Sequence, residues 1–263
     1  MKKMDLTKIL TKSSEAIKTV GSFILAESGK IKNEQIETKS LNSLVTFVDK
    51  TAEIMLVKSL KEILPESVFI TEENTIGQEK GIYQWIIDPL DGTTNFISGI
   101  PIFSISVALR KHEEITMGIV YEINRDELFS AILNQGAFLN GKKIQVTSNT
   151  ALENTLIATG FPYYDFKNLD TYMETLRFLM QNTRGVRRLG SAAVDLCYTA
   201  CGRFDAFFEY SLSPWDIAAG GLIVSEAGGT VSDFSGGTNW LFGKEIIAGN
   251  SAIVMPILQK LNA

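Results

Sequence analysis

The sequence is 263 residues long, and its 45% hydrophobic and 21% charged residues give the composition of a globular protein, which excludes disorder. Asp and Glu number 30 against 25 Lys and Arg, a formal net charge of −5, and no basic cluster is longer than the pair Arg187–Arg188. This balance does not favour nucleic acid as a partner, because backbone phosphates are bound by clustered Lys and Arg.

The single histidine, His112, excludes metal sites that are built from several imidazoles. Oxygen ligands must then hold any metal, which favours Mg²⁺, Mn²⁺ or Ca²⁺ over zinc or copper. His112 lies in the charged segment 110–114 between two apolar alternating runs, where we expect a solvated hairpin loop.

The two cysteines, Cys197 and Cys201, are four residues apart, which places them on one face of a helix and predicts buried core thiols instead of a redox pair. The basic N-terminal residues are not followed by an apolar signal-peptide core, and no segment approaches about 18 uninterrupted apolar residues. We therefore expect a cytoplasmic, reduced, soluble protein that does not contact a membrane.

The first sixty residues have the apolar spacing of two helices. The first helix presents Leu6, Leu10, Ile17, Val20 and Ile24 on one face, and a second helix over 48–63 ends before Pro65. The polar residues 31–43 are predicted to form the loop between them.

After Pro65 the pattern becomes that of β-strands. Strands are predicted over 68–71, 84–88, 103–110, 115–123 and 127–133. Their connections are mostly short, which predicts a largely antiparallel sheet. Turn glycines follow over 136–144.

From there, strand and helix patterns alternate, which is typical of an α/β arrangement of helices on a sheet. Strands are expected over 155–161, 185–190 and 204–210, and helices over 172–180, 191–200 and 215–228. We expect one unit over 1–263 with two lobes, an N-terminal α+β lobe over 1–146 and a C-terminal α/β lobe over 147–263. No Pro/Gly/Ser-rich linker separates them.

Acidic side chains follow two of the predicted strands at the point where each strand ends. Glu72 and Glu73 come after 68–71, and Asp88 and Asp91 come after 84–88. Strand ends are common ligand sites in α/β proteins. Asp, Pro and Gly also favour a simple tight turn. The small residues and amides of 92–94 directly after the two carboxylates favour a cradle for a metal-bound phosphate instead.

A third acidic element lies at residues 213–221. Ser213 as N-cap, Pro214 at the first helical position and Asp216 three residues after the cap match a capping box. The same geometry presents the Asp216 carboxylate at a helix N-terminus, where it can face a cation. Both interpretations of Asp216 remain open at this level.

Two long segments resemble the signatures of the inositol monophosphatase family of Mg²⁺-dependent, lithium-sensitive sugar phosphatases. WIIDPLDGTTNF (85–96) matches the first signature and PWDIAAGGLIVSEAGG (214–229) the second. Segments 44–53, 70–74 and 190–209 occur in the family's order, so the resemblance covers nearly the whole chain. It implies a layered αβαβα sandwich and a homodimer, with metal-binding loops in the first lobe and substrate contacts in the second.

The resemblance also implies roles for individual residues. The ligands of a first metal are Glu72, Asp88 and the carbonyl of Leu90, and those of a second are Asp88, Asp91 and Asp216. The catalytic residues beside the attacking water are Glu72, Thr93 and Asp49. The substrate contacts are Leu90, Asp91, Gly92, Thr93, Gly190, Ser191, Ala192, Glu209 and Asp216. The supporting polar residues are Lys39 and Glu73.

Charge alone requires cations at such a site. The carboxylates of Glu72, Asp88, Asp91 and Asp216 carry −4 together. Two unit charges about 4 Å apart repel by roughly 4 kcal/mol even at a dielectric constant of 20, so the bare cluster would reject a phosphate dianion. Two or three Mg²⁺ ions per site would offset this charge. The resemblance further implies that Mn²⁺ can substitute for Mg²⁺ and that Ca²⁺ or Li⁺ inhibits.

The function that the resemblance implies is hydrolysis of inositol 1-phosphate or a similar small sugar phosphate by direct attack of a metal-activated water. Alternatives on the same fold are fructose-1,6-bisphosphatase, NADP phosphatase and 3′-phosphoadenosine 5′-phosphate phosphatase. Thr94 follows the DGT triplet where relatives of the last class usually carry Lys, which disfavours that class.

Three further alternatives stay open. Arg187 and Arg188 either meet a second substrate phosphate or form a solvated strand end. The aromatic loop 161–166 either rims the pocket or packs elsewhere. In another class, the chain is a non-catalytic metal-binding regulator.

Overall fold

A computed structural model describes residues 5–31, 34, 36–40, 43–76, 81–162 and 165–263. Helices α1 (Leu6–Glu27) and α2 (Phe47–Ile63) confirm the two helices that the apolar spacing predicts. Asp5 caps α1 by accepting a hydrogen bond from the backbone N–H of Lys8 at 3.1 Å. The prediction of one loop over 31–43 was wrong, because β1 (Ile36–Ser40) and β2 (Ser43–Thr46) form an antiparallel hairpin there.

The first large sheet has seven strands in the order β3-β4-β5-β6-β7-β8-β9. Its strands are β3 (Val68–Thr71), β4 (Tyr83–Asp91), β5 (Ser104–Lys111), β6 (Glu114–Glu122), β7 (Glu127–Ile132), β8 (Ala137–Leu139) and β9 (Lys142–Ile144). Only β3 and β4 pair in parallel, so the prediction of a largely antiparallel sheet is confirmed. The glycine-rich segment 136–144 contains two short strands that its turn residues did not reveal.

The second large sheet has five strands in the order β11-β10-β12-β14-β13. Its strands are β10 (Leu156–Thr159), β11 (Gly185–Arg187), β12 (Ala206–Tyr210), β13 (Thr230–Ser232) and β14 (Glu245–Gly249). The helices of this half are α4 (Leu169–Asn182), α5 (Ala192–Ala200), α6 (Pro214–Glu226) and α7 (Ser251–Leu261). Helices α4, α5 and α6 confirm the helices expected over 172–180, 191–200 and 215–228, whereas α7, β13 and β14 lie beyond the last predicted element. We propose the boundary between the lobes in the connection from β9 to β10.

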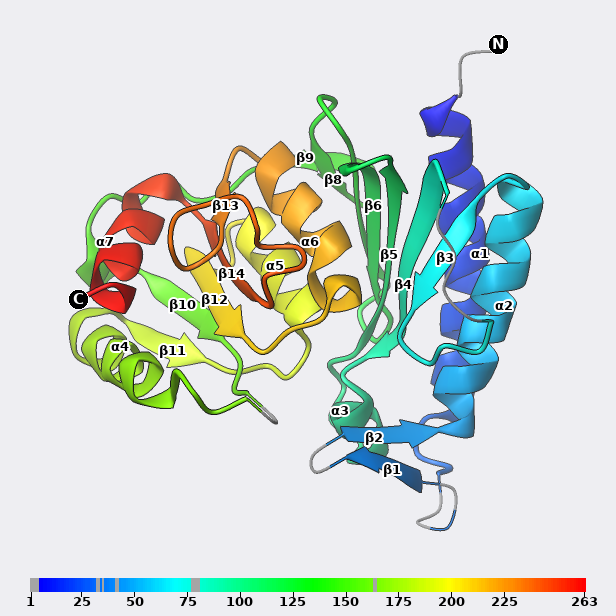
Figure 1. The fold of residues 1–263 in the computed structure, drawn as a ribbon, viewed down its shortest axis with the longest axis horizontal. Helices are drawn as coiled ribbons and strands as arrows, with labels where there is room; N and C mark the ends of the chain where they lie inside the picture. Colours follow the sequence, from blue (N-terminus) through cyan, green and yellow to red (C-terminus); the bar gives the residue numbers. More distant parts are fainter. Residues whose placement is uncertain (1–4, 32–33, 35, 41–42, 77–80, 163–164) are drawn as a thin grey trace.

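The elements stack in five layers (Figure 1). Helices α1 and α2 cover the outer face of the seven-stranded sheet, α5 and α6 lie between the two sheets, and α4 and α7 cover the outer face of the five-stranded sheet. This confirms the αβαβα sandwich. No helix in the described part of the chain is long and apolar enough to cross a membrane.

The histidine and the cysteines lie in different elements of the fold. His112 is exposed in the turn between β5 and β6, as predicted. Cys197 is fully buried in α5, whereas Cys201 at the end of that helix is half-buried, so the prediction of buried thiols holds completely for the first only.

Candidate active site

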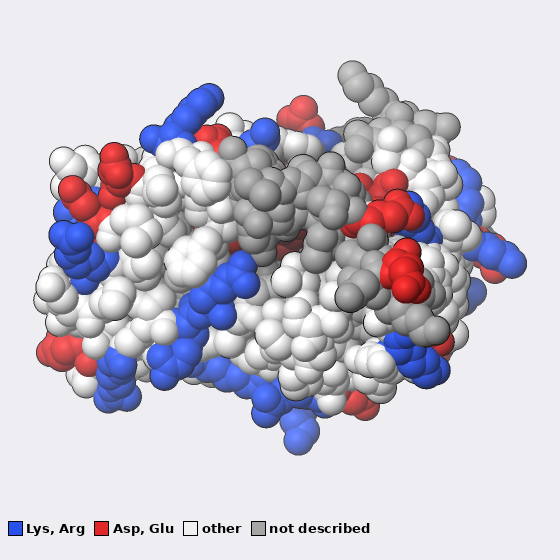
Figure 2. Space-filling view, turned by 90° about the horizontal axis from the view of Figure 1, so that it is seen from below, with Lys and Arg blue, Asp and Glu red and all other residues white. Residues whose placement is uncertain are grey.

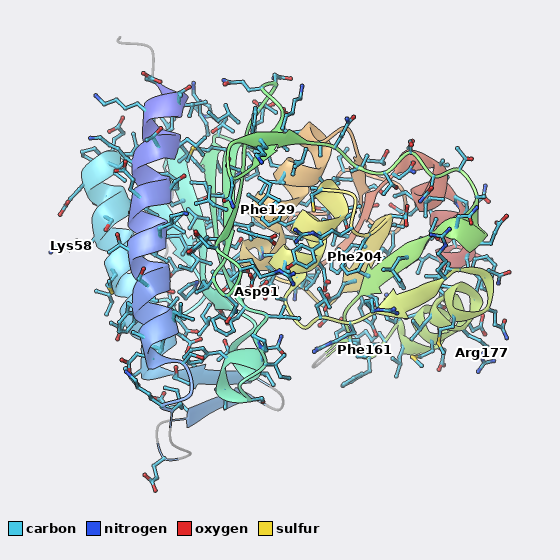
Figure 3. All side chains as sticks on the ribbon, turned by 180° about the vertical axis from the view of Figure 1, so that it is seen from behind. Lys58, Asp91, Phe129, Phe161, Arg177 and Phe204 are labelled. Atoms are coloured by element: carbon cyan, nitrogen blue, oxygen red, sulfur yellow. The ribbon has the colours of Figure 1, made fainter. Side chains whose placement is uncertain are left out.

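Strand β4 ends in two carboxylates that the sheet register brings to one face. Asp88 pairs with Ser106 of β5, and Asp91 pairs with Ser104. An advance of three residues along β4 is therefore matched by two residues along β5, which is a β-bulge. Residues three apart in a regular strand point to opposite faces, but this bulge returns both to the same face. Figure 3 shows Asp91 between the seven-stranded sheet and the helices of the second half.

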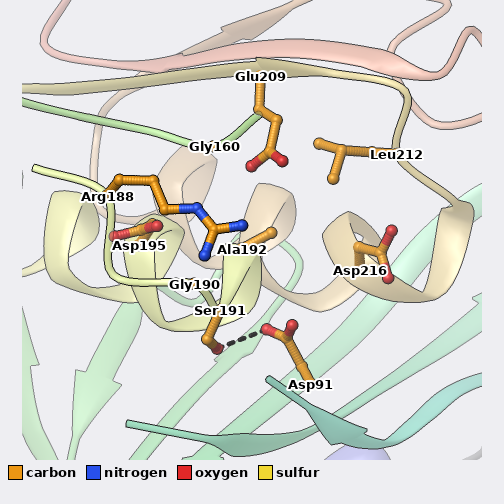
Figure 4. A pocket seen from close by; sticks show the side chains of 10 residues that line it. All are labelled: Asp91, Gly160, Arg188, Gly190, Ser191, Ala192, Asp195, Glu209, Leu212 and Asp216. Atoms are coloured by element: carbon orange, nitrogen blue, oxygen red, sulfur yellow. Dashed lines mark hydrogen bonds between the residues drawn. The ribbon is translucent and has the colours of Figure 1, made fainter. Parts of the chain in front are cut away.

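The N-terminal turns of α5 and α6 meet these carboxylates. Asp91 accepts a hydrogen bond from the Ser191 hydroxyl at 2.6 Å (Figure 4). It also accepts one from the backbone N–H of Ala193 at 2.8 Å, so both donors lie at the start of α5. Asp216, in the first turn of α6, accepts from the backbone N–H of Ser213 at 2.7 Å. Asp216 therefore caps its helix and also lines the pocket between the two halves.

Asp49 and Thr93 form a hydrogen-bonded pair although they are 44 residues apart. Asp49 lies fully buried in the first turn of α2, where its Oδ2 accepts from the backbone N–H and the hydroxyl of Thr46 at 2.8 and 2.7 Å. Its Oδ1 accepts from the Thr93 hydroxyl at 2.9 Å. Burial raises the pKa of Asp49, and the hydrogen bonds from Thr46 and Thr93 lower it in part.

Gly92 forms the turn that joins β4 to the short helix α3 (Thr93–Ile97). Its φ of 96° lies in the left-handed region that favours glycine. A Cβ atom there would lie 3.1 Å from the carbonyl oxygen of Ile102 and 3.3 Å from that of Gly190. A side chain at residue 92 would therefore strain the turn that places Thr93 beside Asp49.

The four predicted metal-ligand carboxylates share one electrostatic environment. Burial raises the pKa of Asp88 well above its ordinary value, and the charges of Glu72, Asp91 and Asp216 raise it further. Burial also raises the pKa of Asp91 to about 6, against hydrogen bonds from Ser191 and Ala193. Burial raises the pKa of Asp216, and the charge of Asp91 raises it further. The fold therefore brings Glu72, from the loop after β3, together with acids from β4 and α6.

The donor set of this cluster fits Mg²⁺. All the side-chain donors are carboxylates, the cluster contains no imidazole or thiol, and Asp88 is only 2% exposed. Among the described residues, no group of three or more His, Cys, Asp or Glu side chains lies in an arrangement that could hold a metal ion as it stands. Like charges held this close without water are costly unless protons or cations offset them, so this environment would favour a bound cation.

A pocket of ≈ 80 Å³ lies between the two halves, beside this cluster (Figure 4). Six of its lining residues were predicted as site residues: Asp91, Gly190, Ser191, Ala192, Glu209 and Asp216. The remaining lining residues are Gly160, Arg188, Asp195 and Leu212. The pocket thus contains carboxylates from both halves of the chain, whereas Asp88 and Glu72 lie in the cluster next to it.

Glu209 reaches the pocket from β12 because Gly160 leaves room for it. A Cβ atom on Gly160 would lie 2.0 Å from the Glu209 carboxyl group, so any larger residue would displace that side chain. Burial raises the pKa of Glu209, the charge of Asp216 raises it further, and the charge of Arg188 lowers it. Nothing in the sequence pattern marks Gly160 except its place near the end of the strand predicted over 155–161.

Asp195 is a pocket residue that sequence reasoning missed. It is 1% exposed, and its Oδ1 has no hydrogen-bond partner among the described residues. Burial raises its pKa, as does the charge of Glu209, whereas the charge of Arg188 lowers it. A lone carboxylate inside the apolar helix segment 191–200 was the signal that could have found it.

The other predicted residues are placed as follows. Leu90 is buried next to Asp88, and its carbonyl oxygen lies 3.0 Å from the Thr93 hydroxyl oxygen. Glu73 follows Glu72, and its backbone N–H donates to Glu53. Lys39 belongs to β1, but its side chain lies outside the described part of the structure.

The structure places Arg187, Arg188 and the start of the aromatic loop 161–166, for which the sequence left two interpretations each. Arg187 and Arg188 are exposed at the end of β11, and the Arg188 side chain also lines the pocket. Its guanidinium lies 5.8 Å from the centre of the Phe161 ring, which connects the loop 161–166 to the pocket. Residues 163–164 of that loop lie outside the described residues.

The metal-free protein should lose stability as pH rises from about 4 to above 6. The folded-state pKa values of Asp88, Asp91 and Asp216 are raised above 3.8, so their protonation favours the folded state. That contribution is complete below the unfolded pKa and disappears as pH passes the folded pKa. Thermal unfolding in chelator across this range measures the loss.

The same pH series with Mg²⁺ is the control. Cations that offset the cluster should remove most of the fall, whereas carboxylates elsewhere titrate equally in both series. Identical pH dependence with chelator and with Mg²⁺ would contradict a cation site at this cluster.

Comparison with known proteins gives one family. The family model of the inositol monophosphatase family matches residues 5–262. The Nus factor SuhB of Escherichia coli is 44% identical over 226 residues, which cover 85% of this chain and 84% of that protein.

Solved structures agree with this match. The extragenic suppressor protein suhB of Bartonella henselae has a TM-score of 0.90 at 38% identity, covering 96% of this chain and 98% of that one. The IMPase of Thermotoga maritima has a TM-score of 0.88 at 35% identity, covering 96% of both chains. The chain therefore belongs to the inositol monophosphatase family.

Proposed function

We propose that this protein is a Mg²⁺-dependent phosphomonoesterase that hydrolyses inositol 1-phosphate or a similar small sugar phosphate. The observation that supports it most is the meeting of Asp88, Asp91 and Asp216, from β4 and α6, with Glu72 beside one pocket. An all-carboxylate cluster next to a polar pocket suits a phosphate ester held through hard cations. The family match supports the same class of reaction.

Glu72, Asp88, Asp91, Asp216 and the Leu90 carbonyl would hold the cations. We propose that each site binds two or three Mg²⁺ ions. Mn²⁺ would replace Mg²⁺, and Ca²⁺ or Li⁺ would inhibit the enzyme. When bound, Mg²⁺ lowers the pKa of water and neutralises developing charge on phosphate oxygens.

Thr93 and Asp49 would orient the attacking water. The Thr93 hydroxyl donates its single proton to Asp49 Oδ1, which leaves the lone pairs of Thr93 Oγ1 to accept a hydrogen bond from water. A water held in this way exposes its own lone pair to the phosphorus atom. The backbone N–H groups of Gly92 and Thr93, at the start of α3, have no intrahelical acceptor and suit phosphate oxygens.

The pocket would bind the rest of the substrate through hydroxyl groups. Glu209 and Asp195 offer carboxylate oxygens as acceptors for such hydroxyls. Of the charged lining residues, four are acidic and only Arg188 is basic. Arg188 already faces Glu209 and Asp195, whose pKa values its charge lowers. A second phosphate would meet these carboxylates, so the pocket favours a monophosphate over a bisphosphate.

Figure 2 shows the end of the molecule at which β4 runs into α3, with Lys and Arg side chains gathered in a band across that face. Basic side chains on this face would attract an anionic substrate despite the net charge of −5. From the family resemblance we also propose a homodimeric, cytoplasmic protein with no nucleic-acid substrate.

Phosphate release from a small panel tests the proposal. The panel is inositol 1-phosphate, fructose 1,6-bisphosphate, NADP⁺ and 3′-phosphoadenosine 5′-phosphate, each with Mg²⁺, with chelator, and with Mg²⁺ plus Li⁺. We expect the fastest release from inositol 1-phosphate, no release in chelator, and inhibition by Li⁺. Faster release from a bisphosphate would overturn the assignment of substrate class.

The second candidate is a non-catalytic metal-binding regulator. The name Nus factor, which the Escherichia coli relative carries, favours a role other than turnover. Against it, the described residues retain Glu72, Asp88, Asp91, Asp216 and the Thr93–Asp49 pair. No release from any substrate of the panel, together with normal Mg²⁺ binding, would favour this candidate.

A further inference from the structure

Glu53 is a buried carboxylate that binds the loop carrying Glu72. It lies on α2 and is 0% exposed. Its Oε1 accepts from the Thr71 hydroxyl at 3.0 Å, and from the backbone N–H and hydroxyl of Thr75 at 2.8 and 2.7 Å. Its Oε2 accepts from the backbone N–H of Glu73 at 2.7 Å. One side chain therefore receives four hydrogen bonds from a segment of five residues.

These donors flank Glu72 on both sides. Thr71 immediately precedes it and Glu73 immediately follows it, while the backbone N–H of Glu72 donates to the carbonyl of Ile87 at 3.3 Å. Between the two main-chain donors to Glu53 lies Asn74, whose φ of 52° is left-handed and unfavourable for most residues. The path of the loop around Glu72 thus depends on acceptors that Glu53 supplies.

The same helix also holds the catalytic threonine. Asp49 lies four residues before Glu53, so both carboxylates lie on one face of α2. Asp49 binds Thr93 at the start of α3, and Glu53 binds the loop of Glu72. One helix face therefore fixes two parts of the site that come from different segments of the chain.

We propose that Glu53 is a positioning residue for the proposed phosphatase reaction: it holds Glu72 where that carboxylate can bind a cation. The inference rests on the proposed function. It adds Glu53, to which the family resemblance assigns no role. A merely structural carboxylate would change the stability of the fold without changing the affinity for Mg²⁺. A positioning residue changes both, because partners behind a metal ligand typically affect metal affinity by about 10- to 100-fold.

The variant Glu53→Gln tests this assignment. Gln keeps the size of the side chain but replaces one acceptor oxygen by an NH₂ donor, which cannot accept from Glu73 or from the Thr71 and Thr75 donors. The matched control is Asp205→Asn. Asp205 is 4% exposed and accepts from the Thr147 hydroxyl, the Asn149 side chain and the backbone N–H of Leu156, away from the cluster.

Two measurements distinguish the variants. Calorimetric titration with Mg²⁺ should show affinity lowered by about 10- to 100-fold in Glu53→Gln and unchanged in Asp205→Asn. Hydrogen exchange in chelator should show faster exchange at the amides of Glu73 and Thr75 in Glu53→Gln only. In turnover assays, higher Mg²⁺ should restore kcat of Glu53→Gln, with KM for the phosphate ester little changed.

A milder pair of variants covers the case in which Glu53→Gln does not fold. Thr75 is exposed, so Thr75→Val removes one donor hydroxyl and leaves the buried carboxylate in place. We expect Mg²⁺ affinity to fall by about threefold, less than the 10- to 100-fold of Glu53→Gln, because only one of the four hydrogen bonds to Glu53 is lost. Thr75→Ser should restore the affinity.

The outcomes separate this inference from the proposed function. Wild-type affinity for Mg²⁺ in Glu53→Gln, or in Thr75→Val where the first variant does not fold, overturns the positioning role while the phosphatase assignment stands. A wild-type protein that neither binds Mg²⁺ nor releases phosphate overturns the proposed function, and this inference with it.

Discussion

Asp88→Asn is expected to lower the rate of Mg²⁺-dependent phosphate release by about 10³-fold, the order seen when one electrostatic group of an active site is removed. Asp88 is the carboxylate on which the charges of Glu72, Asp91 and Asp216 all act, which places it at the centre of the cluster. Asparagine has nearly the same shape and can still accept from the backbone N–H of Leu90, which Asp88 Oδ1 binds at 2.9 Å. The loss would therefore report charge and not local folding.

The same variant should be more stable than the wild type when divalent cations are absent, although it is less active. Without divalent cations, Asp88→Asn removes a buried charge from among three like charges, so its melting temperature should exceed that of the wild type. With Mg²⁺ the order should reverse, because the variant has lost a ligand that couples cation binding to folding. Parallel melting curves and rates measure both effects, with Asp205→Asn as a buried control. Activity within about tenfold of wild type, under 1.4 kcal/mol, would refute the proposal that Asp88 is a ligand shared by two cations.

The sequence predicts the helices and strands of this fold well because their apolar periods are regular. The pattern over 68–133 predicts the first five strands of the large sheet, and Pro65 correctly marks the end of α2. The hairpin of β1 and β2 was missed because its polar residues have no alternating apolar face. The strands of 136–144 were missed because each is only three residues long.

The sequence predicts the candidate site less completely than it predicts the fold. Motif spacing identifies Asp88 and Asp91, but the bulge that turns both to one face depends on pairing with Ser106 and Ser104. Local sequence does not encode that register. Glu53 and Asp195 are single carboxylates within helix patterns, and only tertiary packing shows that the first binds the loop of Glu72 and the second lines the pocket.

Thr93→Val should lower kcat by about 10²-fold, the lower range for loss of one proton-transfer or water-orienting group, with little change in KM or in Mg²⁺ affinity. Valine has the shape of threonine and keeps the backbone N–H at the start of α3, so only the hydroxyl bound to Asp49 Oδ1 at 2.9 Å is lost. Without it, Asp49 retains its hydrogen bonds from Thr46, and α2 stays capped.

Thr94→Val is the matched control, because Thr94 is the next residue, is exposed, and has the same side chain. Thr93→Ser should recover most of the lost rate, since serine supplies a hydroxyl at the same backbone position. Steady-state kinetics at saturating Mg²⁺ separate kcat from KM, and calorimetry gives the Mg²⁺ affinity. Equal losses in Thr93→Val and Thr94→Val would mean that the start of α3 matters through its folding alone. A fall in Mg²⁺ affinity that accounts for the whole loss would instead make the Thr93 hydroxyl part of the cation site, and the water would then need another partner.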